Sequence, residues 1–423
     1  MSGAGQGAAA GTAAVLSAAL AGELGEAVRL RHELHADPEL SGSEHRTAAR
    51  MAAALDAADA PPVAGTGRLV RIGPSHGPCI AVRAELDALP VAEQTGAPWA
   101  SRNGAMHACG HDVHMAALAA LGRAARQACP PAASSAGLPA RASAAPPAGL
   151  PAALLAVLQP SEEAEPSGAR DIVASAAFAA QQPRAVIAVH LQHQLPRGTV
   201  AAAAGTVNAA ADDFEITVQG AAGHAGYPQL AADPVLALCQ AVVTLQQIVS
   251  RRTDPTHGAV VSVGALEAGQ APNVIPAAAV ARGTLRALDQ ADRAAMRTML
   301  REIVQHVCLA HGCQGTVTID EGEPALVNDE SLATASWPWL RQAGFTVDTS
   351  FRSCGSDDFA FYGATAPSLM MFIGAGSPVT LHHPGFLPDD DLVGQVASAM
   401  LAGYLGARGL LGGDRGQDEL SPA

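Results

Sequence analysis

The spacing of apolar residues predicts alternating helices and strands in the first half of the chain. The segment ELGEAVRLRHELHADPEL has helical periodicity and ends at Pro38, since proline disfavours helical backbone in the residue before it. The run Cys79–Val82 is apolar throughout, as in a buried strand, and polar residues Arg83, Glu85 and Asp87 follow it. HDVHMAALAALGRAARQA is again helical in its periodicity. This alternation indicates an α/β fold.

Two later apolar runs also end in polar residues. AALLAVLQPSEE leads to Gln159, Glu162 and Glu163, and RAVIAVHLQ leads to His190. Open α/β sheets build their sites at the carboxyl ends of successive strands. We therefore expect these side chains to lie near one another.

The pattern changes at about residue 209. Strand-like and helical segments follow in the order strand, helix, strand, strand, helix, strand, from DDFEITVQG to QGTVTIDEG. This order predicts a smaller α+β domain of ferredoxin-like type over residues 209–319, inserted into the first domain.

Length and composition give the remaining domain boundaries. A chain of 423 residues exceeds what one hydrophobic core usually serves. We predict a catalytic domain with a central mixed sheet flanked by helices, formed by residues 21–208 and 320–412. Residues 1–20 are rich in Gly and Ala and are expected to be disordered, and residues 130–151, rich in Pro, Ala and Ser, read as a surface insertion.

Charge and residue usage exclude several classes of function. The net charge of −14 disfavours nucleic acid and anionic membranes as partners. All 25 basic residues are arginine, so a P-loop lysine and a lysine Schiff base are both excluded. Seven irregularly spaced cysteines indicate free thiols in a reducing compartment, and the N-terminal segment lacks the basic residues of a secretory signal. We expect a cytoplasmic protein.

The stretch MHACGHDVH, residues 106–114, has three possible interpretations. Cys109 and His111 alternate on a short loop before a helix, so both side chains can face one ion, and thiolate and imidazole suit zinc or a similar metal. Cys109 could instead be a nucleophile with a histidine base. The polar residues could also be capping or core groups. The stretch alone leaves all three open.

The acidic pair Glu162 and Glu163 also has two interpretations. Both could favour the N-terminus of a helix that Ser161 caps. Alternatively, one carboxylate binds a metal ion while the other takes a proton from metal-bound water. Alone, His190 and the His382-His383 pair are weak signals. Together with the cysteine, the other histidines and the two acids, they form a set that can assemble a two-metal site.

Nine motifs in this order resemble those of the metal-dependent N-acyl-amino-acid amidohydrolases, a group that includes aminoacylases, hippurate hydrolases and auxin-conjugate hydrolases and is related to the dizinc carboxypeptidases. The motifs are RHELHADPELSGSE, VRAELDALPV, MHACGHDVH, LQPSEE, GAAGHAGYP, APNVIP, GTLRALD, GSDDFAFY and LHHPGF. The resemblance implies two divalent ions per subunit, zinc, manganese, cobalt or nickel, with the ligands Cys109, His111, Glu163, His190 and His382.

The resemblance also implies roles for six further residues. Glu162 would be the general base, and Asp87 and His114 would orient metal ligands. In the inserted domain, which would act as a lid and in dimerisation, His224 would reach a catalytic site, typically that of the partner in a homodimer, and polarise the scissile carbonyl. The substrate's carboxylate would be held by Asn273 and Arg286.

The implied reaction is hydrolysis of the amide bond of an N-acyl amino acid by a metal-activated water. A dipeptidase or metallocarboxypeptidase of the same fold, and a catalytically silent binding protein, are the alternatives. Glu85 and Asp357 depart from the family pattern, which has Asp and Glu there, so the resemblance assigns them no role.

Overall fold

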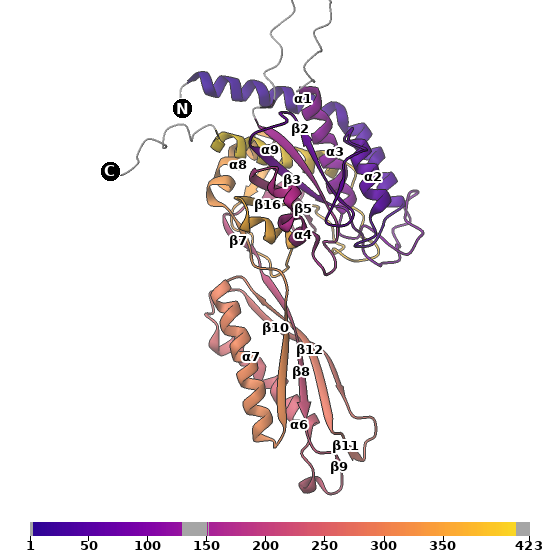
Figure 1. The fold of residues 1–423 in the computed structure, drawn as a ribbon, viewed down its shortest axis with the longest axis vertical. Helices are drawn as coiled ribbons and strands as arrows, with labels where there is room; N and C mark the ends of the chain where they lie inside the picture. The colour runs from indigo at the N-terminus through magenta and orange to yellow at the C-terminus, as the bar shows by residue number, and fades with distance from the viewer. Residues whose placement is uncertain (1–2, 129–149, 151, 412–423) are drawn as a thin grey trace, which may run out of the picture. The chain divides into compact units, whose positions relative to one another are not determined.

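The computed structural model describes residues 3–128, 150 and 152–411, which form two compact units (Figure 1). Unit 1 comprises Met1–Gly205, Asn328–Phe351 and Phe361–Ala423, and unit 2 comprises Thr206–Val327 and Arg352–Ala360. Unit 2 therefore interrupts the chain of unit 1 twice. Among the described residues, no helix combines the length and the apolar character that a membrane span requires.

The described part of unit 1 contains an eight-stranded mixed sheet with the order β1-β2-β4-β3-β5-β16-β6-β15. Its central strands are parallel: β3 pairs with β4 and β5, and β5 pairs with β16. Every residue of β3, β4 and β16 is buried, as expected for strands covered on both faces. The strands are β1 (Pro62–Val63), β2 (Gly67–Ile72), β3 (Cys79–Glu85), β4 (Ala153–Gln159), β5 (Pro183–Gln192), β6 (Thr199–Ala201), β15 (Thr346–Asp348) and β16 (Ser368–Gly374).

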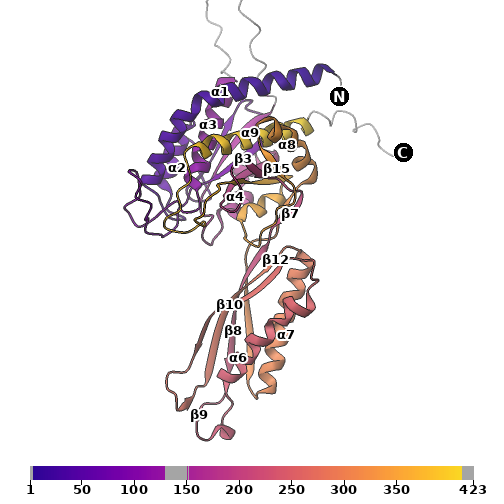
Figure 2. The same cartoon turned by 180° about the vertical axis from the view of Figure 1, so that it is seen from behind.

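Helix α3 packs on β3 and β4, helix α9 packs on β3 and β5, and α1 packs on both of these helices (Figure 2). This arrangement confirms the predicted α/β class with a central mixed sheet flanked by helices. The helices that unit 1 contributes are α1 (Gly3–Ala36), α2 (His45–Ala54), α3 (His111–Ala128), α4 (Gly168–Ala174), α5 (Ala176–Ala179), α8 (Glu330–Gln342) and α9 (Asp391–Leu411), and the 3-10 helix η3 (Asp358–Ala364) joins the two units along the chain.

The N-terminus differs from the prediction of a disordered segment at 1–20. Helix α1 begins at Gly3, and Ala13, Leu16 and Leu20 belong to the core of unit 1. Alanine has the highest helix propensity, and these three residues recur at helical spacing, but the many small neighbours hide the apolar stripe in the sequence. Of the predicted insertion at 130–151, only Leu150 is a described residue, and it is buried; the rest of the segment lies outside the described residues.

Unit 2 has the predicted element order. Its four-stranded antiparallel sheet has the order β10-β12-β8-β13, and the helices α6 and α7 pack on it. Phe214, Ile216 and Val218 alternate along β8 and are buried, because successive strand residues point to opposite faces. The elements are β8 (Ala210–Gln219), α6 (Pro234–Leu245), β10 (Ala259–Ala268), β12 (Ala278–Ala287), α7 (Gln290–Ala310) and β13 (Gln314–Glu321).

Shorter elements complete the described chain. They are β7 (Gly205–Asn208), β9 (Gly223–His224), η1 (Pro228–Leu230), η2 (Ile248–Arg252), β11 (Val274–Ile275) and β14 (Leu326–Asn328). The segment 352–360, which we predicted within the catalytic domain, groups with unit 2. The reason is local pairing: the amide of Ser353 donates to Val207 at 2.9 Å, and that of Ala209 donates to Gly355 at 3.0 Å.

Candidate metal centre

The parallel strands β3, β4 and β5 carry polar residues at their carboxyl ends. Asp87 lies two residues after β3, Glu162 and Glu163 lie three and four residues after β4, and His190 is near the end of β5. Because these strands are neighbours and parallel, their carboxyl ends share one edge of the sheet. The loop before α3 adds Cys109, and His111 is the first residue of that helix.

The structure brings all five predicted ligands together. The Sγ atom of Cys109 lies 3.4 Å from Nε2 of His190 and 3.3 Å from Nε2 of His382. Glu163 joins the two sides of the cluster, since its Oε1 atom lies 3.4 Å from Nε2 of His382 and 3.8 Å from Nε2 of His111. All but His382 are largely buried, so the cluster opens to solvent on the side of that residue.

Two histidines turn their Nε2 atoms toward this cluster. Nδ1 of His111 donates to the carbonyl of Asp87 at 2.9 Å, and Nδ1 of His190 donates to that of Leu191 at 2.7 Å. In the neutral ring, this hydrogen bond leaves the lone pair on Nε2. Metal-binding histidines are commonly held in this way, with one nitrogen fixed by a backbone carbonyl and the other left for the ion.

Buried atoms without a hydrogen-bond partner also indicate that a metal ion fits this cluster. Within the described residues, Nε2 of His111 and Oε1 of Glu163 are buried and have no hydrogen-bond partner, although they face each other. Buried polar atoms are normally paired. Among the described residues, four groups of possible ligands have donor atoms within 4.8 Å of one another, and two of these groups share the carboxylate of Glu163: Cys109, Glu163 and His382, and His111, Glu162 and Glu163. Glu163 belongs to both, as expected for two neighbouring ions.

The carboxylate of Asp87 fixes the loop that carries Glu162 and Glu163. Oδ2 of Asp87 accepts hydrogen bonds from the amides of both residues at 2.9 Å and from the hydroxyl of Ser41 at 2.7 Å. The next helix, α4, begins only at Gly168, with Ser167 as its cap. The alternative in which Ser161 caps a helix that begins with the acidic pair is therefore wrong.

A residue that the sequence reasoning missed supports the same loop. The buried carboxylate of Glu44 accepts from the amides of Ser161, at 2.8 Å, and Gly42, at 2.9 Å, and from the hydroxyl of Thr66. The feature of the sequence that could have indicated Glu44 is its position as the last residue of the motif RHELHADPELSGSE. Ser161 itself has a φ of +51°, an unusual conformation for a residue other than glycine, which these bonds hold in place.

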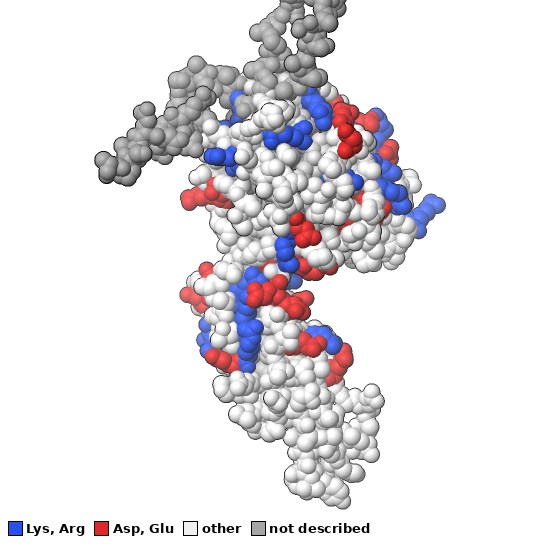
Figure 3. All heavy atoms as spheres, in the orientation of Figure 1, with Lys and Arg blue, Asp and Glu red and all other residues white. Residues whose placement is uncertain are grey.

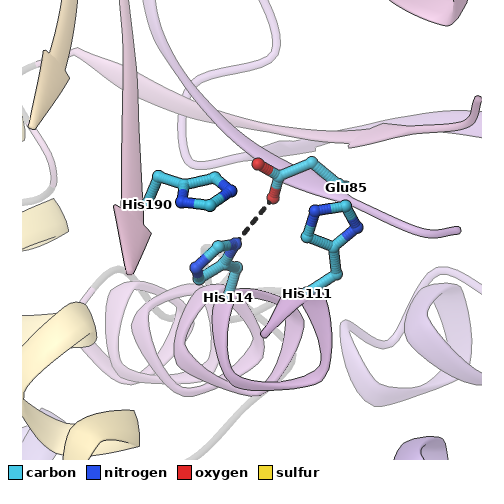
Figure 4. Close-up of side chains that lie close together, drawn as sticks. All are labelled: Glu85, His111, His114 and His190. Atoms are coloured by element: carbon cyan, nitrogen blue, oxygen red, sulfur yellow. Dashed lines mark hydrogen bonds and ion pairs between the residues drawn. The ribbon is translucent and has the colours of Figure 1, made fainter. Parts of the chain in front are cut away.

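Glu85 and His114 form a buried pair beside His111 and His190 (Figure 4). Nδ1 of His114 donates to Glu85 at 3.0 Å, and its Nε2 accepts from the amide of Leu191 at 3.1 Å. His114 thus holds the backbone next to His190 and has no nitrogen left for an ion. Burial would raise the pKa of Glu85, but Arg83, His114 and His111 outweigh burial and hold it well below its usual range.

The surroundings of Cys109 disfavour its role as a nucleophile. Burial, followed by the carboxylates of Glu163 and Glu162, raises the pKa of its thiol well above the usual range. A nucleophilic cysteine needs a lowered pKa. A cation among Cys109, Glu163 and His382 would reverse this effect, because a thiol that coordinates a metal ion does so as a thiolate.

The remaining predicted residues lie in unit 2. His224 in β9 pairs with Val274 in β11, and the amide of Ala225 donates to the carbonyl of Asn273 at 3.1 Å, so His224 and Asn273 are neighbours. Arg286 is opposite Ala211 near one end of the sheet, and its guanidinium donates to the hydroxyl of Ser356 at 2.8 Å.

Asn273 and Arg286 are not brought together within one chain. The loop that contains Asn273 leads into the other end of β12, at Ala278, which is eight residues before Arg286. Eight strand residues span about 27 Å.

The carboxylate of Asp357, the second departure from the family pattern, accepts from the amide of Phe359 at 2.8 Å at the start of η3.

The chain is similar to known proteins over most of its length. Residues 81–401 match peptidase family M20/M25/M40. An N-acetylcysteine deacetylase of Bacillus subtilis (strain 168) is 31% identical over 381 residues, which are 89% of this chain and 94% of that protein. An N-acetyldiaminopimelate deacetylase of the same organism is 31% identical over 386 residues, 90% and 97% of the two chains.

Solved structures have the same fold. A putative aminohydrolase from methicillin-resistant Staphylococcus aureus has a TM-score of 0.81 at 28% identity, over 92% of this chain and 98% of that one. The Bacillus subtilis YXEP protein, described as a dinuclear metal-binding peptidase of the M20 family, has a TM-score of 0.76 at 28% identity, over 92% and 99%.

Proposed function

Because the chain belongs to peptidase family M20/M25/M40 and is a hydrolase of amide C–N bonds, we propose that it cleaves N-acyl amino acids into an acyl group and a free amino acid. The observation that carries this proposal is the convergence of five ligand side chains beside Glu162. The deacetylases among its relatives act on acylated amino acids by name. We place the reaction in the cytoplasm, in keeping with the free thiols.

The ligands are Cys109, His111, Glu163, His190 and His382, and they suit two divalent ions. When bound, such ions lower the pKa of a water molecule toward neutrality and polarise a carbonyl. Glu162 is the general base: its Oε2 atom lies 3.9 Å from Nε2 of His111, and its backbone is held by Asp87. It takes the proton of the attacking water and returns it to the leaving amine.

His224 polarises the scissile carbonyl, while Asn273 and Arg286 hold the substrate's carboxylate. An N-acyl amino acid spans about two residues, or about 7 Å, far less than the separation of Arg286 from the other two along the sheet. One unit 2 therefore cannot present all three side chains to one substrate. Two subunits of a homodimer, one giving His224 and Asn273 and the other giving Arg286, can do so.

Exposed apolar side chains in unit 2 support the homodimer. Leu236 and Val243 on α6 are 56% and 68% exposed, and Leu230 is 78% exposed. On the face drawn in Figure 3, the end of unit 2 near β9 and β11 shows no charged side chain. Exposed apolar side chains that form a contiguous patch are typical of protein interfaces.

The identity of the metal follows from the donor set only in part. Thiolate and imidazole favour zinc, cobalt or nickel, while a carboxylate shared by both groups also suits manganese. Reconstitution of metal-free protein with each of the four ions, followed by activity assays, identifies the ion in use.

Cys109→Ser is expected to weaken the binding of one ion, because a serine hydroxyl is a poor ligand beside a thiolate. Chelator competition measures the loss, and the ion content should fall toward one per subunit. Cys79→Ser, at a buried cysteine in β3, is the control and should keep both ions. Unchanged metal content in Cys109→Ser, together with loss of activity on thiol alkylation and no response to chelators, would favour a cysteine nucleophile instead.

A substrate panel tests the proposed specificity. N-acetyl amino acids should be hydrolysed faster than dipeptides by the metal-loaded protein, measured by release of free amino acid. Faster cleavage of dipeptides would favour the dipeptidase or carboxypeptidase alternative. Binding of N-acyl amino acids without turnover would favour a catalytically silent binding protein.

A further inference from the structure

The motif RHELH and the aspartate of MHACGHDVH meet in a buried cluster of charges outside the ligand set. Arg31 and His35 lie one turn apart on α1, and both side chains are fully buried. Nε of Arg31 donates to Oδ2 of Asp112 at 3.0 Å, and Nδ1 of His35 lies 3.0 Å from the same oxygen. Asp112 directly follows the ligand His111 in α3.

The same arginine reaches the segment that follows His382. Its NH1 group donates to Asp390 at 2.7 Å, and its NH2 group donates to the carbonyl of Pro388 at 2.6 Å. One buried guanidinium therefore connects α1 to the start of α3 and to the loop after LHHPGF. Its planar, forked set of donors suits this geometry, which a lysine ammonium cannot reproduce.

His35 extends the connection to a third segment. Its Nε2 atom lies 3.2 Å from Oε2 of Glu93, and that oxygen accepts from the amide of Ser101. Burial alone would lower the pKa of His35, but Asp112 and Glu93 outweigh burial and raise it. The positive charge of Arg31 offsets the negative charge of the buried Asp112.

The three segments tied by this cluster also carry or contact the metal ligands. The amide of His382 donates to the carbonyl of Ala108, beside Cys109, at 2.9 Å, and the amide of Gln94 donates to the carbonyl of Pro384 at 2.8 Å. His382 has a φ of +65°, a strained conformation that persists only when its surroundings fix it. The spacing of Cys109, His111 and His382 therefore depends on how these segments are held.

We propose that Arg31, through Asp112 and the 388–390 segment, is a positioning residue that sets the relative placement of Cys109, His111 and His382 and thereby the affinity for metal. This inference rests on the proposed metal centre. Within the described part of the chain, the hydrogen bonds and ion pairs of Arg31 go to Asp112, Asp390 and the carbonyl of Pro388, so its effect on the ligands passes through the segments that carry them. Outer partners of metal ligands typically change metal affinity by about 10- to 100-fold when they are altered.

The test compares two conservative replacements of buried arginines. Arg31→Lys keeps the positive charge but loses the planar set of guanidinium donors. Arg293→Lys makes the same change in unit 2, where Arg293 donates to both oxygens of the buried Asp212 and to two backbone carbonyls. Metal affinity is measured by chelator competition with Co²⁺, and the absorption band of the Cys109 thiolate bound to Co²⁺ reports on that ligand. Thermal melting of the metal-free proteins reports on stability.

We expect both variants to melt at lower temperature than the wild type, but only Arg31→Lys to lose about 10- to 100-fold in Co²⁺ affinity and to shift the thiolate band. Asp112→Asn, which is isosteric, should change affinity and band in the same direction if Arg31→Lys does not fold. Wild-type Co²⁺ affinity and an unchanged thiolate band in both Arg31→Lys and Asp112→Asn would overturn this inference but not the proposed function. A wild-type protein that binds no ion would overturn the proposed function as well.

Discussion

Glu162→Gln is expected to lower kcat by at least about 10²-fold while both metal ions stay bound, because a glutamine amide cannot accept the proton of the attacking water. The side chain keeps its size, and the amide hydrogen bond to Asp87 is made by the backbone, so the loop should keep its conformation. Measurement of kcat and of metal content by elemental analysis on the same preparation separates the two effects.

Glu165→Gln is the matched control for that variant. Glu165 lies three residues further along the same loop, with an exposed side chain that contacts Ser167 and Arg170. Its neutralisation should leave kcat unchanged. Near-normal turnover in Glu162→Gln would remove the general base from the mechanism, and loss of metal in that variant would instead make Glu162 a ligand.

His224→Ala is expected to lower kcat by about 10²- to 10³-fold, the usual cost of removing one donor to a developing oxyanion, or roughly 2.7–4 kcal/mol. Its imidazole is exposed, and its Nδ1 atom accepts from the amide of Gly226 at 2.9 Å, which leaves Nε2 for the substrate. His257→Ala, at an exposed histidine of unit 2 that pairs with Asp292, is the control and should retain activity.

Mixing the two inactive variants tests whether His224 acts across subunits. If it does, a heterodimer of Glu162→Gln and His224→Ala contains one intact site, made of Glu162 from one subunit and His224 from the other. Random exchange of subunits in a twofold dimer should then restore about one quarter of wild-type activity. No recovery after proven exchange, or full activity in a monomeric preparation, would place His224 in the site of its own subunit.

The position of the candidate site was predictable because its signals are local. Each buried strand of unit 1 is a continuous apolar run, and polar residues such as Asp87 and His190 stand where the runs end. The topology of parallel neighbours then brings those ends together. Unit 2 was predictable for a similar reason, since its alternation of apolar residues along β8 fixes which face meets the helices.

The partners of the buried polar residues were not predictable from local pattern. The sequence assigned no role to Glu85, and only the fold shows that it receives a hydrogen bond from His114, a residue 29 positions away. The pairing of Arg31 with Asp112 spans 81 positions, and that with Asp390 spans 359. Such contacts depend on how helices pack on the sheet, which periodicity does not encode.

The N-terminal helix shows the same limit in an apolar segment. Composition alone suggested disorder, because Gly and Ala bury little area, but Leu16 and Leu20 pack into the core of unit 1 once the rest of that core exists. Helices of this kind gain most of their stability from tertiary packing rather than from their own sequence.

The sequence by itself determined the element order of both units, because strand and helix periods are properties of neighbouring residues. The five candidate ligands came from the resemblance of its short motifs to those of a known family. Only the tertiary structure decided that Cys109, His111, Glu163, His190 and His382 meet in one cluster and that His114 forms hydrogen bonds with Glu85 and Leu191. It also decided that Arg286 lies at the opposite end of β12 from the loop that contains Asn273. These outcomes depend on contacts between residues far apart in the chain, and packing of the whole fold selects them.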